Sequence, residues 1–252
     1  MFAIERRGAI LEQLSADGKV VVSELAVRFG VTEETVRRDI DKLAKEGLAT
    51  KTYGGAVSNV SPSSDLPYNV RKRFNVDLKQ NIAEKVASMI NDGDRIMLDA
   101  STTAIYVTRK IKSKKNITVI TNSVEILLEL ADKTGWTILS TGGTLKEGAF
   151  SMVGMSAEKM VRGYHVDLAV CSAKGIDGKM GITDSNEKDS EMKRAIFASA
   201  DKKLLALDST KFDKISFVKV CDISDVDIIV TDKAPSDAWQ KRLSESGVKL
   251  IY

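Results

Sequence analysis

Short apolar runs of strand character alternate with helical stretches over the last two thirds of this 252-residue chain, and this alternation constrains the fold more than any other feature. Six such runs follow one another: RIMLD, ITVIT, WTILS, DLAVC, KLLAL and DIIVT. Alternating strands and helices are typical of an α/β domain with a largely parallel sheet. We therefore predict one larger α/β domain over residues 75–252.

A stretch without periodicity separates that region from the first sixty residues. Pro62 and Pro67 lie in SNVSPSSDLPYNV, which has neither a helical nor a strand period. Segments of this composition usually connect domains. We interpret residues 59–74 as a linker and residues 3–58 as a separate, small N-terminal domain.

The N-terminal domain is predicted to contain two helices joined by a short turn. After a first helix over residues 4–16, Ser23 is placed to cap the helical segment SELAVRFG. Thr32 is placed to cap the next helix, with Val31 and Val36 at the positions of a hydrophobic staple. This arrangement describes a helix-turn-helix, and the LATKTYGGAV segment after it indicates a β-hairpin that forms a wing.

The second helix of the pair carries residue types that read DNA. Its apolar positions face one way, so Arg37 and Arg38 face solvent. An arginine near a helix N-terminus can reach the major groove and donate two hydrogen bonds to guanine O6 and N7. The alternative is that both arginines are ordinary solvated surface charges. We predict DNA contacts at Ser23, Thr32, Thr35, Arg37, Arg38, Lys42, Lys51, Tyr53 and Gly54.

The distribution of charge fits a local DNA contact. The chain has 38 Lys and Arg against 35 Asp and Glu, but residues 1–60 hold nine of each sign. Residues 61–75 add a net charge of +2. Glu33 and Glu34 lie in the first turn of the predicted recognition helix, where they favour its dipole. We expect modest non-specific affinity for DNA, with discrimination left to a few contacts.

Composition excludes several other classes of function. His165 is the single histidine, which excludes sites that need two imidazoles. Cys171 and Cys221 lie far apart in apolar runs and are interpreted as reduced core thiols. No apolar run is long enough to span a membrane, and MFAIERRGAI has no signal-peptide core. We expect a cytoplasmic protein without a metal or a cofactor.

Three strand-to-helix junctions in the larger domain carry small polar residues or glycines. They are DASTT after RIML, TNS after ITVI and TGG after WTILS. Loop amides and hydroxyls at a helix N-terminus favour an anion such as phosphate, and ligands of α/β sheets collect at the carboxyl ends of strands. Structural capping is the alternative for each junction, and a solvated surface charge is the alternative for each lysine. We predict effector contacts at Asp99, Ser101, Thr102, Thr103, Asn122, Ser123, Gly142, Gly143, Lys174, Glu191, Lys193 and Lys211. Among these, the lysines are candidate counter-charges for a phosphate, and Asp99, Asn122 and Glu191 are candidates for sugar hydroxyls.

Residues 6–57 resemble the winged helix-turn-helix of the DeoR family of bacterial transcriptional regulators. They follow the family pattern V-x-x-L-A-x-x-F-x-V-[ST]-x-x-T-[IV]-R-R-D-[IL]-x-x-L, then G-L and G-G-A. In the wing, Lys51 and Tyr53 stand where the family often has Arg and His. The resemblance implies DNA-facing positions at Thr32, Thr35, Arg37 and Arg38.

The rest of the chain resembles the effector domain of the same family. The D-x-G-T-T phosphate loop corresponds to residues 99–103, with Ser101 where Gly is usual, and the T-N-S, T-G-G and D-S-[ST]-K-F motifs are intact. Within residues 181–195, Gly181, Ile182 and Thr183 match the family's G-[IL]-T, and Glu191, Arg194 and Ala195 correspond to residues of its following E…R-A segment. The resemblance implies the fold of the ribose-phosphate isomerase superfamily and a sensor of phosphorylated sugars or related metabolites.

We therefore expect a non-enzymatic regulator, namely a repressor of a carbohydrate-utilisation operon. It would bind a double-stranded operator as a dimer or tetramer and respond to a phosphorylated sugar. One alternative is a sugar-phosphate isomerase-like enzyme with an accessory helix-turn-helix, in which Asp99 or Glu191 would be the base. Another is an interaction protein whose helix-turn-helix binds a second protein.

Overall fold

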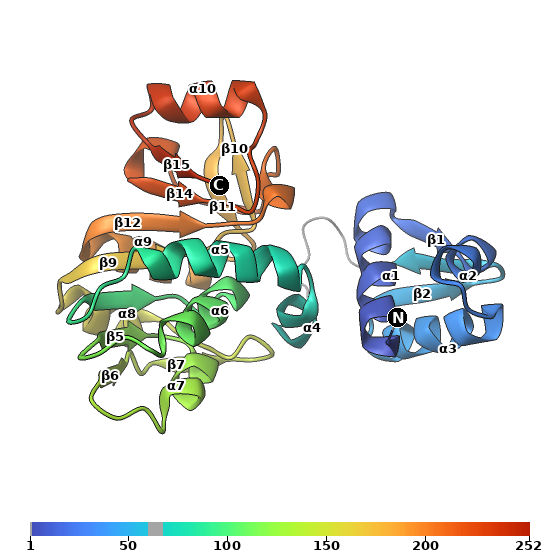
Figure 1. Cartoon of the computed structure of the whole chain (residues 1–252), viewed down its shortest axis with the longest axis horizontal. Coiled ribbons are helices and arrows are strands. Elements are labelled where there is room, and N and C mark those ends of the chain that lie inside the picture. The colour runs from blue at the N-terminus through green and yellow to red at the C-terminus, as the bar shows by residue number, and fades with distance from the viewer. Residues whose placement is uncertain (1, 60–67) are drawn as a thin grey trace. The chain divides into compact units, whose positions relative to one another are not determined.

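The computed structural model of the chain describes residues 2–59 and 68–252. The chain divides into two units, which meet in sequence between Phe74 and Asn75 (Figure 1). Residues 60–67 of the predicted linker lie outside the described residues. The end of that linker was predicted without periodic structure, but Tyr68–Arg73 form a helix, α4. Val70 of α4 packs against the core of the N-terminal unit, and this contact accounts for the helix.

The N-terminal unit is a three-helix domain with a small antiparallel sheet. The sheet has the order β1-β3-β2, so the hairpin that follows the helices pairs with the strand between the first two. Its core includes Leu14, Leu25, Val36 and Ile40. This winged helix-turn-helix agrees with the prediction. Its elements are α1 (Ala3–Asp17), β1 (Lys19–Val21), α2 (Val22–Phe29), α3 (Glu33–Lys45), β2 (Ala49–Thr52) and β3 (Gly55–Ser58).

Of the two predicted helix caps, one is confirmed and one is wrong. Thr32 caps α3, because its side chain accepts a hydrogen bond from the Thr35 amide. Ser23 does not cap α2; the cap position is Val21, and Ser23 lies within the first turn. The Val22 amide instead donates to the Gly54 carbonyl at 2.9 Å. A tertiary contact with the wing thus satisfies an amide at the start of α2, and strand β1 runs directly into the helix.

The C-terminal unit is built on a seven-stranded sheet in the order β15-β14-β12-β9-β4-β5-β6. Every neighbouring pair of strands in it is parallel. All six predicted runs are strands of this sheet, which confirms the α/β class. The prediction missed only the edge strand β15. The sheet strands are β4 (Arg95–Leu98), β5 (Thr118–Thr121), β6 (Thr137–Ser140), β9 (Val166–Cys171), β12 (Ala200–Ala206), β14 (Ile228–Val230) and β15 (Lys249–Ile251).

Helices cover both faces of the sheet, and each face has its own core. Successive strand residues alternate between the two: Met97 packs with one cluster, and its neighbours Ile96 and Leu98 pack with the other. One face is covered by α5 (Val76–Ser88), α6 (Thr102–Ile111) and α7 (Val124–Leu130). The opposite face is covered by α8 (Met155–Arg162), α9 (Glu187–Ala198) and α10 (Asp237–Glu245).

Two smaller sheets, which the sequence did not predict, complete the C-terminal unit. β7 (Thr144–Lys146) and β8 (Ser151–Val153) form a hairpin. The segment after β9 contains β10 (Gly175–Asp177) and β11 (Gly181–Asp184), and β11 pairs with both β10 and β13 (Val218–Cys221). Gly175 is required there, because a Cβ would lie 2.2 Å from the Lys214 carbonyl oxygen. Two single-turn 3-10 helices, η1 (Ser209–Lys211) and η2 (Ile223–Asp225), flank β13 in the chain.

The described residues also bear on three features considered from composition: membrane-spanning segments, metal-ligand clusters and the two cysteines. Within 2–59 and 68–252, no helix is long and apolar enough to cross a membrane. The same residues contain no group of three or more His, Cys, Asp or Glu side chains that could hold a metal ion. Cys171 and Cys221 are free thiols. Burial raises the pKa of Cys171 well above its ordinary value and that of Cys221 to about 12, so both are protonated at neutral pH.

Candidate nucleic-acid interface and effector site

Helix α3 presents the residues that were predicted to read DNA. Thr32 and Thr35 lie at its start, where their hydroxyl oxygens are 3.0 Å apart. Arg37 and Arg38 follow one turn later, and their side chains are 47% and 76% exposed. Lys42 is exposed further along the helix, and Ser23 is exposed in the first turn of α2.

Three cations of α3 and the wing form ion pairs, and each partner is an acidic residue of α3. Arg37 lies 2.8 Å from Glu33 and Arg38 lies 3.2 Å from Glu34, both at i,i+4 spacing. On the wing, Lys51 lies 2.5 Å from Asp41. Three of the nine cations in the first sixty residues are therefore paired with acids on this surface.

The wing is formed by β2, β3 and the turn between them. Tyr53 is fully exposed in that turn, and Gly54 beside it accepts the hydrogen bond from Val22. Gly55 has a packing role, because a Cβ there would lie 1.9 Å from the Val20 carbonyl oxygen. The hairpin is thus held against β1 while its turn projects an aromatic side chain into solvent.

A buried ion cluster on the inner side of α3 was not predicted. Asp39 is only 3% exposed and lies 2.5 Å from Arg6 and 3.4 Å from Arg7, both on α1. Asp39 directly follows the exposed pair Arg37 and Arg38 in sequence. The cluster fixes α3 to α1 and so orients the face that carries those arginines.

In the C-terminal unit, the loop after β4 is organised around the Asp99 carboxylate. Asp99 is 2% exposed and accepts hydrogen bonds from the Ser101 amide at 3.1 Å and the Ser172 amide at 3.0 Å. Ser101 caps α6 by accepting from the Ala104 amide. The amides of Thr102 and Thr103 lie in the first turn of α6, where a helix leaves its N–H groups without intrahelical partners.

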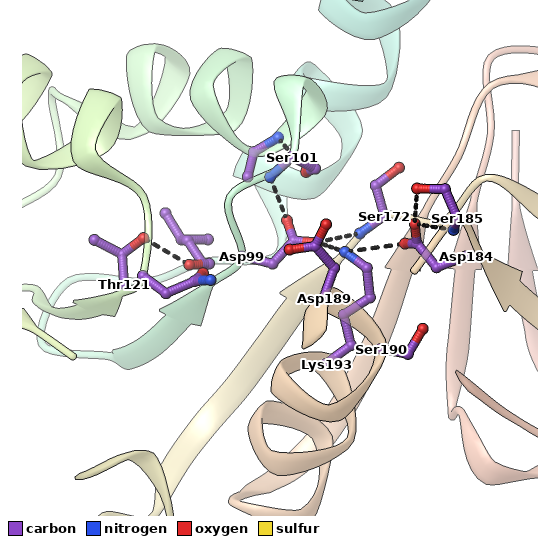
Figure 2. Close-up of polar contacts among 12 residues, drawn as sticks. Asp99, Ser101, Thr121, Ser172, Asp184, Ser185, Asp189, Ser190 and Lys193 are labelled. Carbon is purple, nitrogen blue, oxygen red and sulfur yellow. Dashed lines mark hydrogen bonds and ion pairs between the residues drawn. The ribbon is translucent and has the colours of Figure 1, made fainter. Parts of the chain in front are cut away.

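Lys193 of α9 joins this loop to a second carboxylate (Figure 2). Its ammonium lies 2.7 Å from Asp99 and 3.4 Å from Asp184, and the residue is 8% exposed. Burial alone would lower the pKa of Lys193, but Asp99 and Asp184 raise it well above its ordinary value. Lys193 is therefore a charged side chain whose partners are internal, and Asp99 is already occupied by two amides and this ammonium.

The second junction contains two buried polar atoms without a hydrogen-bond partner among the described residues, on two segments that pair with each other. Asn122 donates to the Met152 carbonyl at 3.0 Å. Ser123 caps α7, and its backbone forms an isolated β-bridge with Ser151 of β8. Asn122 Oδ1 and Ser151 Oγ are buried and have no hydrogen-bond partner within the described part of the chain. A buried polar atom of this kind is costly unless something binds it. Ser151 had not been predicted.

At the third junction, packing accounts for one of the two glycines. Gly143 has a φ of +99°, and a Cβ there would lie 2.8 Å from both the Ala157 Cβ and the Val153 carbonyl oxygen. Packing against β8 and α8 therefore accounts for this glycine. Gly142, with a φ of +60°, has open space where a Cβ would be.

The remaining predicted residues do not all converge on Asp99. Glu191 pairs with Arg194 at 2.8 Å, and Arg194 donates to the Lys219 and Val220 carbonyls, so Glu191 faces β13. The Lys174 amide donates to Thr183 within the smaller antiparallel sheet. Lys211 is half-buried in η1.

A further ion pair joins the β7–β8 hairpin to α9. Lys146 of β7 lies 2.5 Å from Asp189 of α9. Burial would raise the Asp189 pKa, but Lys193, Asn186 and Lys146 lower it below its ordinary value. Lys146, Asp184 and Asp189 were not predicted; Asp184 and Asp189 lie within the matched segment 181–195, but the family pattern specifies neither position.

Comparison with known proteins identifies both units. A family model described as a DeoR-like helix-turn-helix domain matches residues 6–62, and one described as the DeoR C terminal sensor domain matches residues 74–233. The chain belongs to the DeoR family. This DeoR-family chain is therefore a DNA-binding transcriptional regulator with a sensor domain, and both expected resemblances are confirmed. In this regulator Ser101 has a φ of −78°, so the position where the family usually has Gly needs no left-handed backbone.

Curated relatives match almost the whole length of this DeoR-family chain. An uncharacterized HTH-type transcriptional regulator of Bacillus subtilis, YulB, is 38% identical over 99% of this chain and 96% of its own. The putative aga operon transcriptional repressor of Escherichia coli O157:H7 is 30% identical over 98% and 93%. The L-fucose operon activator of Haemophilus influenzae is 32% identical over 96% and 97%.

Solved structures with a similar fold are more distant. The ribose 5-phosphate isomerase A of Methanocaldococcus jannaschii is 16% identical over 55% of each chain, with a TM-score of 0.41. The translation initiation factor eIF-2B of Pyrococcus horikoshii OT3 is 16% identical over 91% of this chain and 88% of its own, with a TM-score of 0.47.

Proposed function

We infer that this DeoR-family regulator represses a carbohydrate-utilisation operon, binds its operator as a dimer or tetramer, and responds to a phosphorylated sugar or a related metabolite. One observation carries the proposal: a winged helix-turn-helix with exposed Arg37 and Arg38 is joined to a sheet whose strand-end loops present the first-turn amides of α6 and the buried, unpartnered Asn122 Oδ1. The relatives named for aga and L-fucose operons support sugar metabolism. Two recognition helices about 34–36 Å apart would read consecutive major grooves, and a footprint with two half-sites tests this spacing.

In the effector site, the phosphate is proposed to bind at the start of α6. The amides of Thr102 and Thr103, in the first turn of α6, are proposed to donate to it, together with the positive end of the helix dipole. Sugar hydroxyls are proposed to donate to Asn122 Oδ1 and Ser151 Oγ, two of the buried polar atoms that have no hydrogen-bond partner among the described residues. Asp99 and Lys193 are proposed to shape the loop from behind. Other predicted effector contacts remain in the proposal as Ser101, Ser123, Gly142, Gly143, Lys174, Glu191 and Lys211.

A panel of sugar phosphates is expected to contain a ligand that stabilises the C-terminal unit. Because only the folded unit binds it, a ligand at 100 times its dissociation constant adds about 2.7 kcal/mol. The measurement is a thermal shift of the full chain, repeated with Asn122→Ala. The variant should lose most of the shift, whereas Asn91→Ala, at an exposed position before β4 and so at the other end of that strand from Asp99, should keep it.

We propose that this binding occurs without turnover. The two carboxylates that could act as an isomerase base are already ion-paired, Asp99 with Lys193 and Glu191 with Arg194. A base must accept a proton from the substrate, which is unfavourable for a carboxylate held by a permanent cation. The same panel in a coupled aldose–ketose assay serves as the control, and steady turnover by purified protein would favour the isomerase-like alternative.

Arg37→Ala is expected to weaken operator binding by about 1–3 kcal/mol, because the variant loses a side chain that can donate two hydrogen bonds to one guanine. The measurement is a gel-shift titration on a duplex selected by the wild-type protein from a random pool. Lys45→Ala removes the same charge from the last turn of α3 and should change the affinity far less. Equal losses for both variants would contradict the role of Arg37.

A further inference from the structure

Three ion pairs lie on the surface that would meet DNA. They join Arg37 to Glu33, Arg38 to Glu34, and Lys51 of the wing to Asp41. A protein that relies on phosphate contacts usually leaves its cations free, because affinity grows with each phosphate neutralised. Here each of these cations already has a carboxylate partner in the free protein.

We propose that Glu33 and Glu34 are specificity-determining residues, which keep Arg37 and Arg38 from binding phosphates and release them only to base edges. The inference rests on α3 being the helix that reads DNA. Both pairs have the spacing and the Glu-before-Arg order that favour i,i+4 ion pairs on a helix. The glutamates therefore hold the arginines along the same helical face that would enter the groove.

Mixed-sequence DNA and the operator differ in what they offer to an ion-paired arginine. A phosphate is one more anion at the surface, so replacing a glutamate partner with it gains little. A guanine in the major groove offers two acceptors in the geometry of the guanidinium fork, together with discrimination between bases. On mixed-sequence DNA the arginines would stay with the glutamates, and on the operator they would leave them.

A second role of the glutamates, support of the helix dipole, is compatible with this one but predicts a different result. Glutamates in the first turn of α3 stabilise the helix. Loss of that support would lower the stability of the N-terminal unit and weaken binding to all DNA. Loss of the proposed restraint would strengthen binding to mixed-sequence DNA, so the two roles have opposite signs.

The test is the salt dependence of binding by the full-length double variant Glu33→Gln, Glu34→Gln. On a mixed-sequence duplex, two newly available arginines should steepen the slope of log K against log salt by about 2. At 0.1 M salt the affinity for this duplex should rise on the order of tenfold. The affinity for the selected operator duplex should rise only about two- to fourfold, because there the variant gains only the avoided cost of breaking two exposed ion pairs.

Two sets of control variants separate this mechanism from general electrostatics. Asp17→Asn, Glu46→Gln makes the same change in charge at exposed acids of the same unit that lie outside the three pairs, and its slope should stay near the wild-type value. Adding Arg37→Ala and Arg38→Ala to the glutamine variant should abolish the increase in slope. An increase that persists without the arginines would show direct repulsion between glutamate and phosphate and would overturn the proposal.

An unchanged slope for the glutamine variant would also overturn the proposal. The proposed function would still stand in that case if Arg37→Ala and Arg38→Ala weaken operator binding in the wild-type background. If those arginine variants bind every duplex like the wild type, the assignment of α3 as the reading helix fails instead.

Discussion

Lys193→Met is expected to lower the free energy of unfolding of the C-terminal unit by about 3–5 kcal/mol. The substitution leaves Asp99 and Asp184 in a buried site without the cation that neutralises them. Both tryptophans of the chain, Trp136 and Trp239, lie in this unit. Urea unfolding followed by tryptophan fluorescence therefore reports on it alone.

Two further variants give this prediction its controls. Adding Asp99→Asn and Asp184→Asn to Lys193→Met removes the unpaired charges, and most of the lost stability should return. Lys188→Met changes an exposed lysine of the same helix, and its effect should stay within about 0.5 kcal/mol. A Lys193→Met protein that unfolds at the wild-type urea concentration would contradict a buried ion cluster at this position.

Asp39→Ala is expected to destabilise the N-terminal unit by about 3 kcal/mol, at the lower end of the range for broken buried ion pairs. It removes the carboxylate that joins α3 to Arg6 and Arg7 of α1. Hydrogen exchange of the α3 amides in the full chain measures this effect, because it follows the opening of one helix without a fluorescent probe. Exchange in the C-terminal strands should not change.

Glu46→Ala is the matched control for that variant. Glu46 is exposed directly after α3, so its removal should alter exchange by less than about 0.5 kcal/mol. Operator affinity should fall with stability in Asp39→Ala, because this variant loosens the helix that carries the reading side chains. Glu46→Ala should not show this loss. Wild-type protection of α3 in Asp39→Ala would show that the apolar core alone fixes the helix.

Features that depend on local pattern were predictable from the sequence. The six central strand runs, the Thr32 cap and the apolar face of α3 each depend on residues within about one turn or one strand of each other. The prediction failed where a distant residue takes over a local role. Ser23 fits the cap pattern, but the Gly54 carbonyl in the wing accepts the Val22 amide instead.

The candidate sites show the same limit at longer range. Lys193 was predicted as a counter-charge for phosphate, but 94 residues separate it from Asp99, the partner that holds it. Burial of that pair depends on how α9 packs on the sheet, which residue spacing does not reveal. Strands of three residues, such as β7, β8 and β15, are too short for an alternating pattern to stand out.

The packing of α5 on α6 has a mechanical consequence. Helix α6 begins at the proposed phosphate position, and its Ile105 shares a core with Ile82 and Ala83 of α5. Close-packed helices of this kind shift together as a body, because side chains that fill the space between them resist compression. Helix α5 begins at Val76, two residues after the point where the chain leaves the N-terminal unit. A ligand bound at the proposed position in the first turn of α6 would therefore act, through one layer of side chains, on the polypeptide that connects to the N-terminal unit.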